Sequence, residues 1–149
     1  MIKIGDKMPD FEVVDQNGNM VKSQDLLGKK TIIYFYPKDN TSGCTAEACT
    51  LRDNYEAMIA KGYNVIGVSK DSAASHKKFA EKYQLPFTLL ADTSTEMIQA
   101  FGAWGEKSLY GKKYMIVFFP RRSCDFTILP FWSTTSKSGI LSPIFIMVF

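Results

Sequence analysis

Two apolar runs separated by a helical pattern constrain the fold of this 149-residue chain more than any other feature of its sequence. Residues 31–36 read Thr-Ile-Ile-Tyr-Phe-Tyr and are closed by Pro37, and residues 64–69 read Asn-Val-Ile-Gly-Val-Ser. Continuous β-rich apolar runs of this length are typical of strands buried on both faces. Between them, residues 44–60 repeat apolar positions at helical spacing. This order predicts two parallel strands joined by a right-handed crossover helix.

The segments before and after this strand–helix–strand unit also carry strand and helix signals. Residues 11–14 and 19–22 enclose an Asn-Gly pair, which between two such runs is a strong hairpin signal. Residues 72–83 predict a second helix. Thr93 followed three residues later by Glu96 predicts a capping box that opens a third helix. The expected fold class is therefore α/β, with helices on both faces of a central sheet.

Composition excludes several classes of protein. The chain is 46% hydrophobic and 22% charged, which fits a globular domain rather than a disordered tail. Its net charge of +3 is too small to predict a nucleic-acid partner. Its apolar runs fall far short of the roughly 20 residues that span a membrane. We expect one domain over residues 1–149, no membrane segment and, because no secretion signal opens the sequence, a cytoplasmic location.

The numbers of cysteines and histidines argue against two kinds of site, a disulfide scaffold and a multi-histidine metal site. Three cysteines are too few for a disulfide scaffold, and one histidine cannot form a multi-histidine metal site. We therefore expect no metal and no metal-based cofactor.

The segment 37–49 carries the most informative chemistry. Cys44 lies where the loop after the first buried strand gives way to a helix. Free backbone N–H groups and the helix dipole stabilise an anion at that position, and the thiolate is the reactive form of cysteine. Thr41 precedes it by three residues, within reach of the sulfur or of a substrate oxygen. Because Cys44 also falls on the apolar stripe, an inert buried thiol remains an equal alternative on this spacing alone.

The position of Cys49 argues against the interpretation of Cys44 as an inert buried thiol. Five residues along a helix place it on the polar face, with its Cα roughly 8 to 9 Å from that of Cys44. A disulfide rarely tolerates more than about 7 Å between Cα atoms, so the pair cannot bond while the helix is intact. This disfavours a static structural disulfide and is compatible with a bond that is made and broken. Zinc is also disfavoured, since neither cysteine has a Cys-x-x-Cys or histidine companion.

Residues 35–53, with Pro37, Thr41 and Cys44 in the pattern Pro-x-x-x-Thr-x-x-Cys, strongly resemble the peroxiredoxins and, within them, the bacterioferritin comigratory protein (peroxiredoxin Q) subfamily. Further similar stretches extend the resemblance over residues 1–114. It implies a thioredoxin-like fold of three layers around a central mixed sheet, and a thiol-dependent peroxidase without metal, haem or flavin.

The resemblance also implies residue roles. Cys44 would be the peroxidatic cysteine, which becomes a sulfenic acid on attacking hydrogen peroxide or an organic hydroperoxide. Thr41 would orient the peroxide and Pro37 would shield the sulfur from water. Cys49 would be the resolving cysteine, and thioredoxin or a similar dithiol would reduce the resulting disulfide. A monomer with no nucleic-acid or membrane partner is expected.

Other residues receive structural interpretations. We interpret His76 as a solvated surface histidine and Glu47 as a helix-capping residue rather than part of the pocket. Tyr36 and Trp104 are interpreted as core or pocket-wall aromatics. The lysines of the second helix are expected to form a solvated face (Lys77, Lys78 and Lys82).

The last 35 residues depart from the family pattern. They carry four of the 33 charged residues and six of the eleven phenylalanines. The arginine that the family uses beside its thiolate would fall at Phe118 or Phe119, and Arg121 and Arg122 come slightly later. Cys124 has no counterpart in the family pattern. Our hypothesis is that the reading frame changed near residue 115, and the DNA sequence of the alternative frame tests it.

This departure leaves two alternatives to a working peroxidase. One is an inactive thioredoxin-fold remnant that lacks the arginine, whose loss removes stabilisation of the thiolate and the transition state. The other is a general thiol–disulfide oxidoreductase, although such proteins favour Cys-x-x-Cys. The apolar, uncharged residues 144–149 are an aggregation hazard if exposed, so we expect lower solubility and stability than in an intact relative.

Overall fold

The computed structural model describes residues 6–109, 111–117 and 145–148. Its elements, in chain order, are β1 (Glu12–Asp15), β2 (Met20–Lys22), the 3-10 helix η1 (Ser23–Leu26), β3 (Lys30–Phe35), α1 (Ser42–Asp53), α2 (Tyr55–Ala60), β4 (Tyr63–Ser69), α3 (Ala73–Tyr83), β5 (Thr88–Ala91), α4 (Glu96–Ala100), β6 (Trp104–Leu109), β7 (Lys112–Val117) and β8 (Phe145–Val148). Among these residues, no helix is both long and apolar enough to cross a membrane.

The strands form one mixed six-stranded sheet and one separate hairpin. The sheet order is β2-β1-β5-β4-β3-β8, and β6 pairs with β7 alone. The predicted parallel pair is confirmed, since β3 and β4 run parallel with Ile33 opposite Ile66. β5 continues the parallel centre beside β4, while β1 and β8 pair antiparallel at either side of it. The predicted hairpin is confirmed as β1 and β2, with Val13 opposite Val21.

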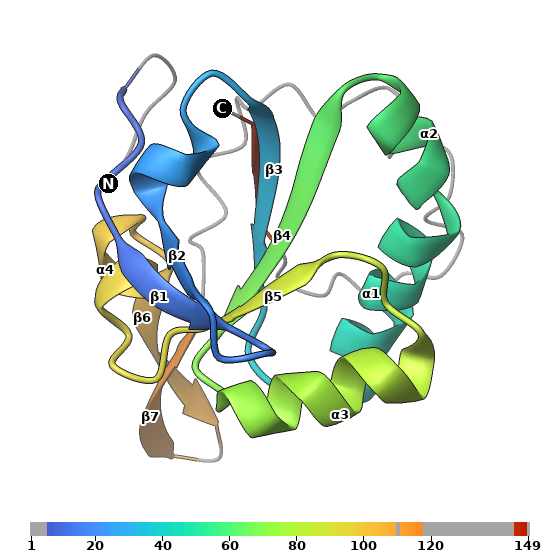
Figure 1. Ribbon diagram of the computed structural model, residues 1–149. Coiled ribbons are helices and arrows are strands. Elements are labelled where there is room, and N and C mark those ends of the chain that lie inside the picture. The colour runs from blue at the N-terminus through green and yellow to red at the C-terminus, as the bar shows by residue number, and fades with distance from the viewer. Residues whose placement is uncertain (1–5, 110, 118–144, 149) are drawn as a thin grey trace.

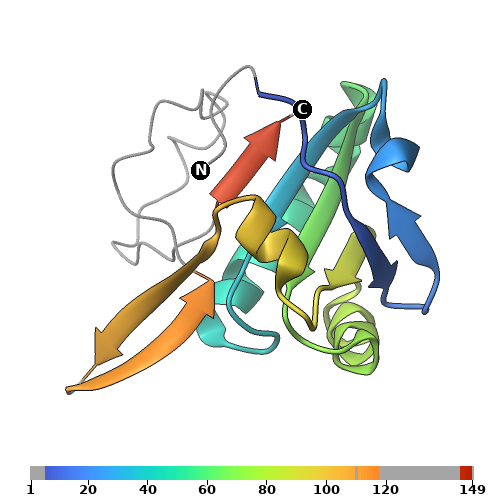
Figure 2. The ribbon, with the colours of Figure 1, turned by 90° about the vertical axis from the view of Figure 1, so that its left-hand side faces the viewer.

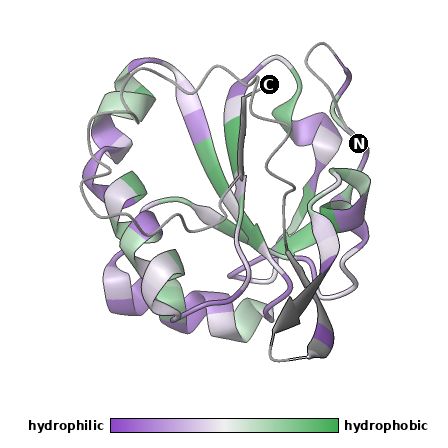
Figure 3. Ribbon diagram, turned by 180° about the vertical axis from the view of Figure 1, so that it is seen from behind, coloured by the Kyte–Doolittle hydropathy of each residue, from purple (hydrophilic) through white to green (hydrophobic). Residues whose placement is uncertain are grey.

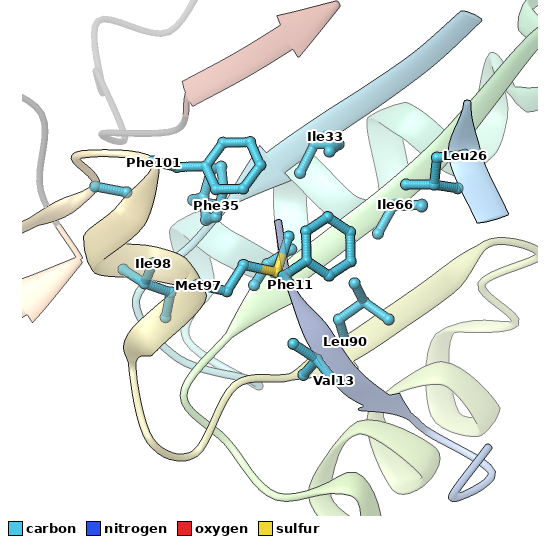
Figure 4. Close-up of a cluster of buried hydrophobic side chains, with 12 residues drawn as sticks. Phe11, Val13, Leu26, Ile33, Phe35, Ile66, Leu90, Met97, Ile98 and Phe101 are labelled. Carbon is cyan, nitrogen blue, oxygen red and sulfur yellow. The ribbon is translucent and has the colours of Figure 1, made fainter. Parts of the chain in front are cut away.

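Successive side chains of β3 point to opposite faces of the sheet, so an apolar layer forms on each face. On one face, Ile33 and Phe35 of β3 pack with residues of β1, β4, β5 and α4 (Figure 4). On the other, Tyr34 and Tyr36 pack against α1 and α3 in a second buried cluster. Figure 1 shows α1, α2 and α3 on one side of the sheet and α4 on the opposite side. The predicted three-layer α/β arrangement is confirmed.

The distribution of polar residues on the outer surfaces agrees with this layered arrangement. Figure 3 shows apolar residues concentrated in the central strands and polar residues on the outward faces of the helices. Lys77, Lys78 and Lys82 are exposed on α3, as expected of a solvated face. Figure 2 shows the β6–β7 hairpin projecting away from the main sheet.

Two helix predictions need correction. The helical pattern over residues 44–60 is divided in two, because Asn54 has φ −107° and ψ 5° and separates α1 from α2. The capping box of Thr93 and Glu96 is wrong. α4 begins at Glu96 itself, after Thr95 in the left-handed region at φ +64°, and the Thr95 side chain makes no capping bond. Asp92 instead satisfies the start of the helix, since its carboxylate accepts the N–H of Ile98 at 2.7 Å.

The atypical tail contributes two strands. β7 continues to Val117 and pairs with β6, and β8 pairs antiparallel with β3, Ile146 opposite Tyr34. The apolar ending predicted to be β-prone is therefore a strand with one edge in the sheet. Residues 118–144, including the possible strand at 126–131, lie outside the described residues.

Gly67 of β4 is a close-approach position. A Cβ there would lie 2.7 Å from the Tyr34 side chain and 2.8 Å from Leu89 Cδ2. We expect Gly67→Ala to lower the free energy of unfolding by about 1–3 kcal/mol through overpacking, measured by urea denaturation. Gly62→Ala is the control, because its Cβ would meet nothing within 4 Å and only its φ of +81° opposes the change. A loss at Gly67 no larger than at Gly62 would contradict the packing explanation.

Candidate active site

The predicted site residues meet where β3 ends. Tyr36 extends the β3–β4 pairing by donating its N–H to the Val68 carbonyl at 3.0 Å. Pro37 then ends the strand, because proline lacks the N–H that further pairing needs. Pro37 is half-buried. The chain crosses a four-residue loop and enters α1, so the end of the central strand sets the position of the helix N-terminus.

The loop closes on itself just before α1. Asn40 adopts a left-handed backbone conformation at φ +59°, which asparagine tolerates better than most residues. The Thr41 hydroxyl donates to the Lys38 carbonyl at 3.0 Å, and its side chain makes no capping bond to the helix. Thr41 is exposed. Its hydroxyl oxygen keeps acceptor capacity and lies at the residue directly before α1.

Cys44 is the third residue of α1. The first helical hydrogen bond runs from the Thr45 N–H to the Thr41 carbonyl at 2.9 Å, so the N–H groups of Ser42, Gly43 and Cys44 precede the helical ladder. Such groups and the helix dipole favour an anion at this end. Cys44 is 7% exposed and belongs to the buried cluster with Ala48 and Leu51 of the same helix.

Cys49 lies in the same helix and is half-buried. Both cysteines are free thiols. Five helical residues separate them, so their Cα atoms are held too far apart for a disulfide as long as α1 keeps this form. Among the described residues, no group of three or more histidine, cysteine or acidic side chains could hold a metal ion.

Glu47 needs a corrected interpretation. It lies in the second turn of α1, one turn beyond Cys44, and no acidic residue occupies the first turn. It therefore cannot cap the helix. Burial raises the pKa of Glu47 to about 7, so close to half of these side chains hold a proton at neutral pH.

Tyr34 lies in the buried cluster that also contains Cys44. Burial raises its pKa well above the ordinary value, and the nearby Glu47, Asp39 and Cys44 raise it further. Its hydroxyl is buried without a hydrogen-bond partner among the described residues, as is that of Thr45. Tyr34 is therefore a neutral phenol at neutral pH, buried in the cluster that β3 shares with α1.

The interpretation of His76 as a surface residue is wrong. Its side chain is fully buried, and its Nδ1 lies 2.8 Å from Asp39 Oδ2. Sequence reasoning missed this pair. The available signal was the spacing of α3, because His76 precedes the buried Phe79 by three residues and so shares its apolar face. Tyr36 is a core aromatic, as predicted. Trp104 is half-buried, with the Lys70 ammonium 5.7 Å from its ring centre.

Comparisons with known proteins agree with this geometry. The sequence profile described as the AhpC/TSA family matches residues 4–125. Peroxiredoxin Bcp of Bacillus subtilis is 47% identical over 114 residues, covering 76% of this chain and 73% of that protein. Peroxiredoxin Bcp of Escherichia coli is 45% identical over 113 residues, covering 76% and 72%.

The chain belongs to the peroxiredoxins.

Solved structures of the peroxiredoxin Q and Bcp type also resemble this chain. A peroxiredoxin Q of Xanthomonas campestris superimposes with a TM-score of 0.68 at 32% identity, over 72% of this chain and 68% of that one. BcpB of Mycobacterium tuberculosis gives a TM-score of 0.68 at 32% identity, over 78% and 75%. The predicted thioredoxin-like fold and the bacterioferritin comigratory protein resemblance are confirmed. As a peroxiredoxin, this chain is a thiol-dependent peroxidase that takes a peroxide substrate and a thiol reductant.

The family's active-site arginine has no counterpart among the described residues. The chain contains three arginines. Arg52 is engaged elsewhere, donating to the Tyr83 carbonyl at 2.7 Å and to Asp53 at 3.0 Å. Arg121 and Arg122, like Phe118, Phe119 and Cys124, lie outside the described residues.

The raised pKa of Glu47 predicts a pH-dependent stability effect. A carboxyl whose folded pKa exceeds its unfolded one costs no stability when it is protonated in both states; its burial penalty grows as pH rises from about 4.5 to about 7 and is fully present above that. We expect Glu47→Gln to raise the free energy of unfolding on the order of 1 kcal/mol at pH 8, with the gain shrinking toward pH 5. Glu56→Gln is the control, because Glu56 is exposed in α2. Equal shifts for both variants at pH 8 would contradict the burial argument.

Proposed function

We propose that Cys44 is the peroxidatic cysteine of this peroxidase and that Cys49 resolves it. The observation that carries the proposal is the placement of a buried cysteine in the first turn of α1, with the second cysteine in the same helix. Pro37 and Thr41 lie on the loop that leads into this turn. Pro37 limits water access and Thr41 presents its hydroxyl to the bound peroxide.

The first step is a displacement at oxygen. The Cys44 thiolate attacks the terminal peroxide oxygen, the S–O bond forms as the O–O bond breaks, and the leaving alkoxide takes a proton to become water or an alcohol. Cys44 is oxidised to sulfenic acid and the peroxide is reduced. The free N–H groups at the start of α1 favour the attacking anion. Glu47, whose pKa of about 7 lets it exchange a proton at neutral pH, lies one helical turn away.

The second step requires a change of shape. The Cys49 thiol attacks the Cys44 sulfur, an S–S bond forms, and the S–OH group leaves as water. Since intact α1 holds the two sulfurs apart, its first turns must unwind for this bond to form. An external dithiol, thioredoxin or a similar protein, then reduces the disulfide by exchange, and α1 can re-form.

The substrate range and setting extend this proposal. Hydrogen peroxide and organic hydroperoxides are the proposed substrates. In support, a related Xanthomonas campestris bacterioferritin comigratory protein, 31% identical with a TM-score of 0.68, has alkyl peroxide reduction activity. We also propose that residues 1–149 act as one domain, as a cytoplasmic monomer, with no nucleic-acid or membrane partner.

The second candidate function is a thioredoxin-fold remnant that does not turn over peroxide. The sequence observation in its favour is phenylalanine where the family has its arginine. The rate of peroxide reaction decides between the two, with the same chain unfolded in denaturant as the reference for an unassisted thiol. A folded chain that reacts no faster than the unfolded one is the remnant.

Cysteine variants test the assignment of roles. Cys44→Ser is expected to abolish peroxide-dependent thiol loss, because it removes the attacking sulfur. Cys49→Ser is expected to keep the first reaction but to stop at a sulfenic acid, which dimedone traps and mass spectrometry detects. Cys124→Ser is the control and should lose two thiols per peroxide like the unchanged chain. Retention of two-thiol loss in Cys49→Ser would show that another thiol resolves Cys44.

Unwinding of α1 is testable by hydrogen exchange. After one equivalent of peroxide, amides 44–49 are expected to exchange faster than in the reduced protein, because the disulfide is incompatible with this helix. Amides 73–83 of α3 serve as an internal control and should be unchanged. Unaltered exchange at 44–49 in fully oxidised protein would contradict the proposed resolving step.

A further inference from the structure

A buried polar cluster lies directly behind the loop that leads to Cys44. At its centre is Asp39, which is 5% exposed. Its carboxylate accepts the Tyr36 hydroxyl at 2.7 Å and the Ser75 hydroxyl at 2.7 Å. The third donor is His76, whose Nδ1 lies 2.8 Å from Oδ2. These contacts join the end of β3 to α3 through a single loop residue.

Both ring nitrogens of His76 have polar partners. Its Nδ1 lies 2.8 Å from Asp39 Oδ2 and 3.3 Å from the Tyr36 hydroxyl. Its Nε2 lies 3.0 Å from the Leu90 carbonyl of β5, which can only accept, so Nε2 donates. The fully buried His76 therefore connects Asp39 to β5.

The backbone of Asp39 is held as well. Its N–H donates to Asp71 Oδ2 at 2.9 Å, and the same carboxylate oxygen accepts the Ser69 hydroxyl at 2.7 Å. The neighbours Lys38 and Asn40, by contrast, are exposed. Asp39 thus fixes this loop to α3 directly and to the end of β4 through Asp71.

The charge of Asp39 is stabilised by these donors. Burial alone would raise its pKa, but hydrogen bonds with His76, Tyr36 and Ser75 and the electrostatic effect of His76 more than offset that and hold the pKa below its ordinary value. Removing the histidine would leave a buried carboxylate without one of its partners, which is unfavourable. The loop would then have to move to hydrate Asp39.

We propose that His76 is a positioning residue for the peroxidase reaction: acting through Asp39, it fixes the loop that carries Thr41 and the start of α1. This inference rests on the proposed function of Cys44. Thr41 hydrogen-bonds Lys38 across the fixed residue, so a displaced Asp39 displaces the Thr41 hydroxyl. The same contact marks where unwinding of α1 begins, because Asp39 stays held while the turn containing Cys44 opens.

Two substitutions at one position separate positioning from general stability. The amide nitrogen of asparagine can take the place of Nδ1, so His76→Asn keeps a donor to Asp39 and loses the bond to Leu90. The amide of glutamine reaches the place of Nε2, so His76→Gln keeps the donor to Leu90 and loses the one to Asp39. Both variants lose the imidazole ring and one of its two hydrogen bonds, and similar losses of stability are expected.

The rates, however, should differ. We expect His76→Gln to slow peroxide oxidation of Cys44 by roughly tenfold to a hundredfold, the cost of small misplacements in a reacting site, and His76→Asn to restore most of that loss. Amides 38–41 should exchange faster in His76→Gln than in His76→Asn. Equal rates and equal exchange in the two variants, compared at equal folded fraction, would overturn the proposal.

The closing experiment also separates this inference from the proposed function. If the unchanged chain does not react with peroxide, the proposed function fails, while hydrogen exchange at 38–41 in the two variants still decides whether His76 fixes the loop. Should either variant not fold, Tyr36→Phe provides the test, because it keeps the ring and removes one donor to Asp39. It is expected to speed exchange at 38–41, with Tyr34→Phe as its control, because the Tyr34 hydroxyl has no hydrogen-bond partner among the described residues. Exchange in Tyr36→Phe no faster than in that control would overturn the proposal.

Discussion

The pairing of β3 with its two neighbours is the constraint on which the rest of the structure depends. β3 is hydrogen-bonded to β4 on one edge and to β8 on the other, and its side chains enter the apolar layers on both faces. A strand held in this way has a fixed end. The loop and helix that follow start from this fixed end. The position of Cys44 is therefore determined by the packing of residues that take no part in its chemistry.

Two carboxyl groups near this site show how local donors decide charge. Asp39 has a less exposed side chain than Glu47, yet its pKa is lowered, because Tyr36, Ser75 and His76 face its carboxylate. For Glu47, burial is the cause of the shift, and its pKa rises to about 7. Asp39 therefore remains an anion, whereas Glu47 can gain or lose a proton at neutral pH. Burial explains the pKa of Glu47 but not that of Asp39, where hydrogen-bond donors outweigh it.

The sequence predicted the features that periodicity and turn chemistry control. The parallel pair, the Asn-Gly hairpin and the placement of Cys44 and Cys49 on one helix all follow from local patterns. The break at Asn54 and the start of α4 did not follow from the apolar periodicity or from the Thr93–Glu96 spacing, since short-range contacts of Asn54 and Asp92 occur there. The Asp39–His76 pair is a contact between residues 37 positions apart. The spacing of His76 and Phe79 could have placed His76 on the buried face of α3, but no local pattern identifies Asp39 as its partner.

The position of β8 has a consequence for how the chain acquires its structure. β3 is made early in synthesis, but the strand that covers its outer edge, Phe145–Val148, is separated from it by most of the chain. Contacts between segments so distant in sequence form late, because a long loop must close first. During translation the edge of β3 therefore stays open until residues 145–148 have left the ribosome. A nascent chain that pauses beforehand presents a row of unpaired backbone groups beside an apolar strand, the kind of surface on which chaperones act and on which misassembly begins.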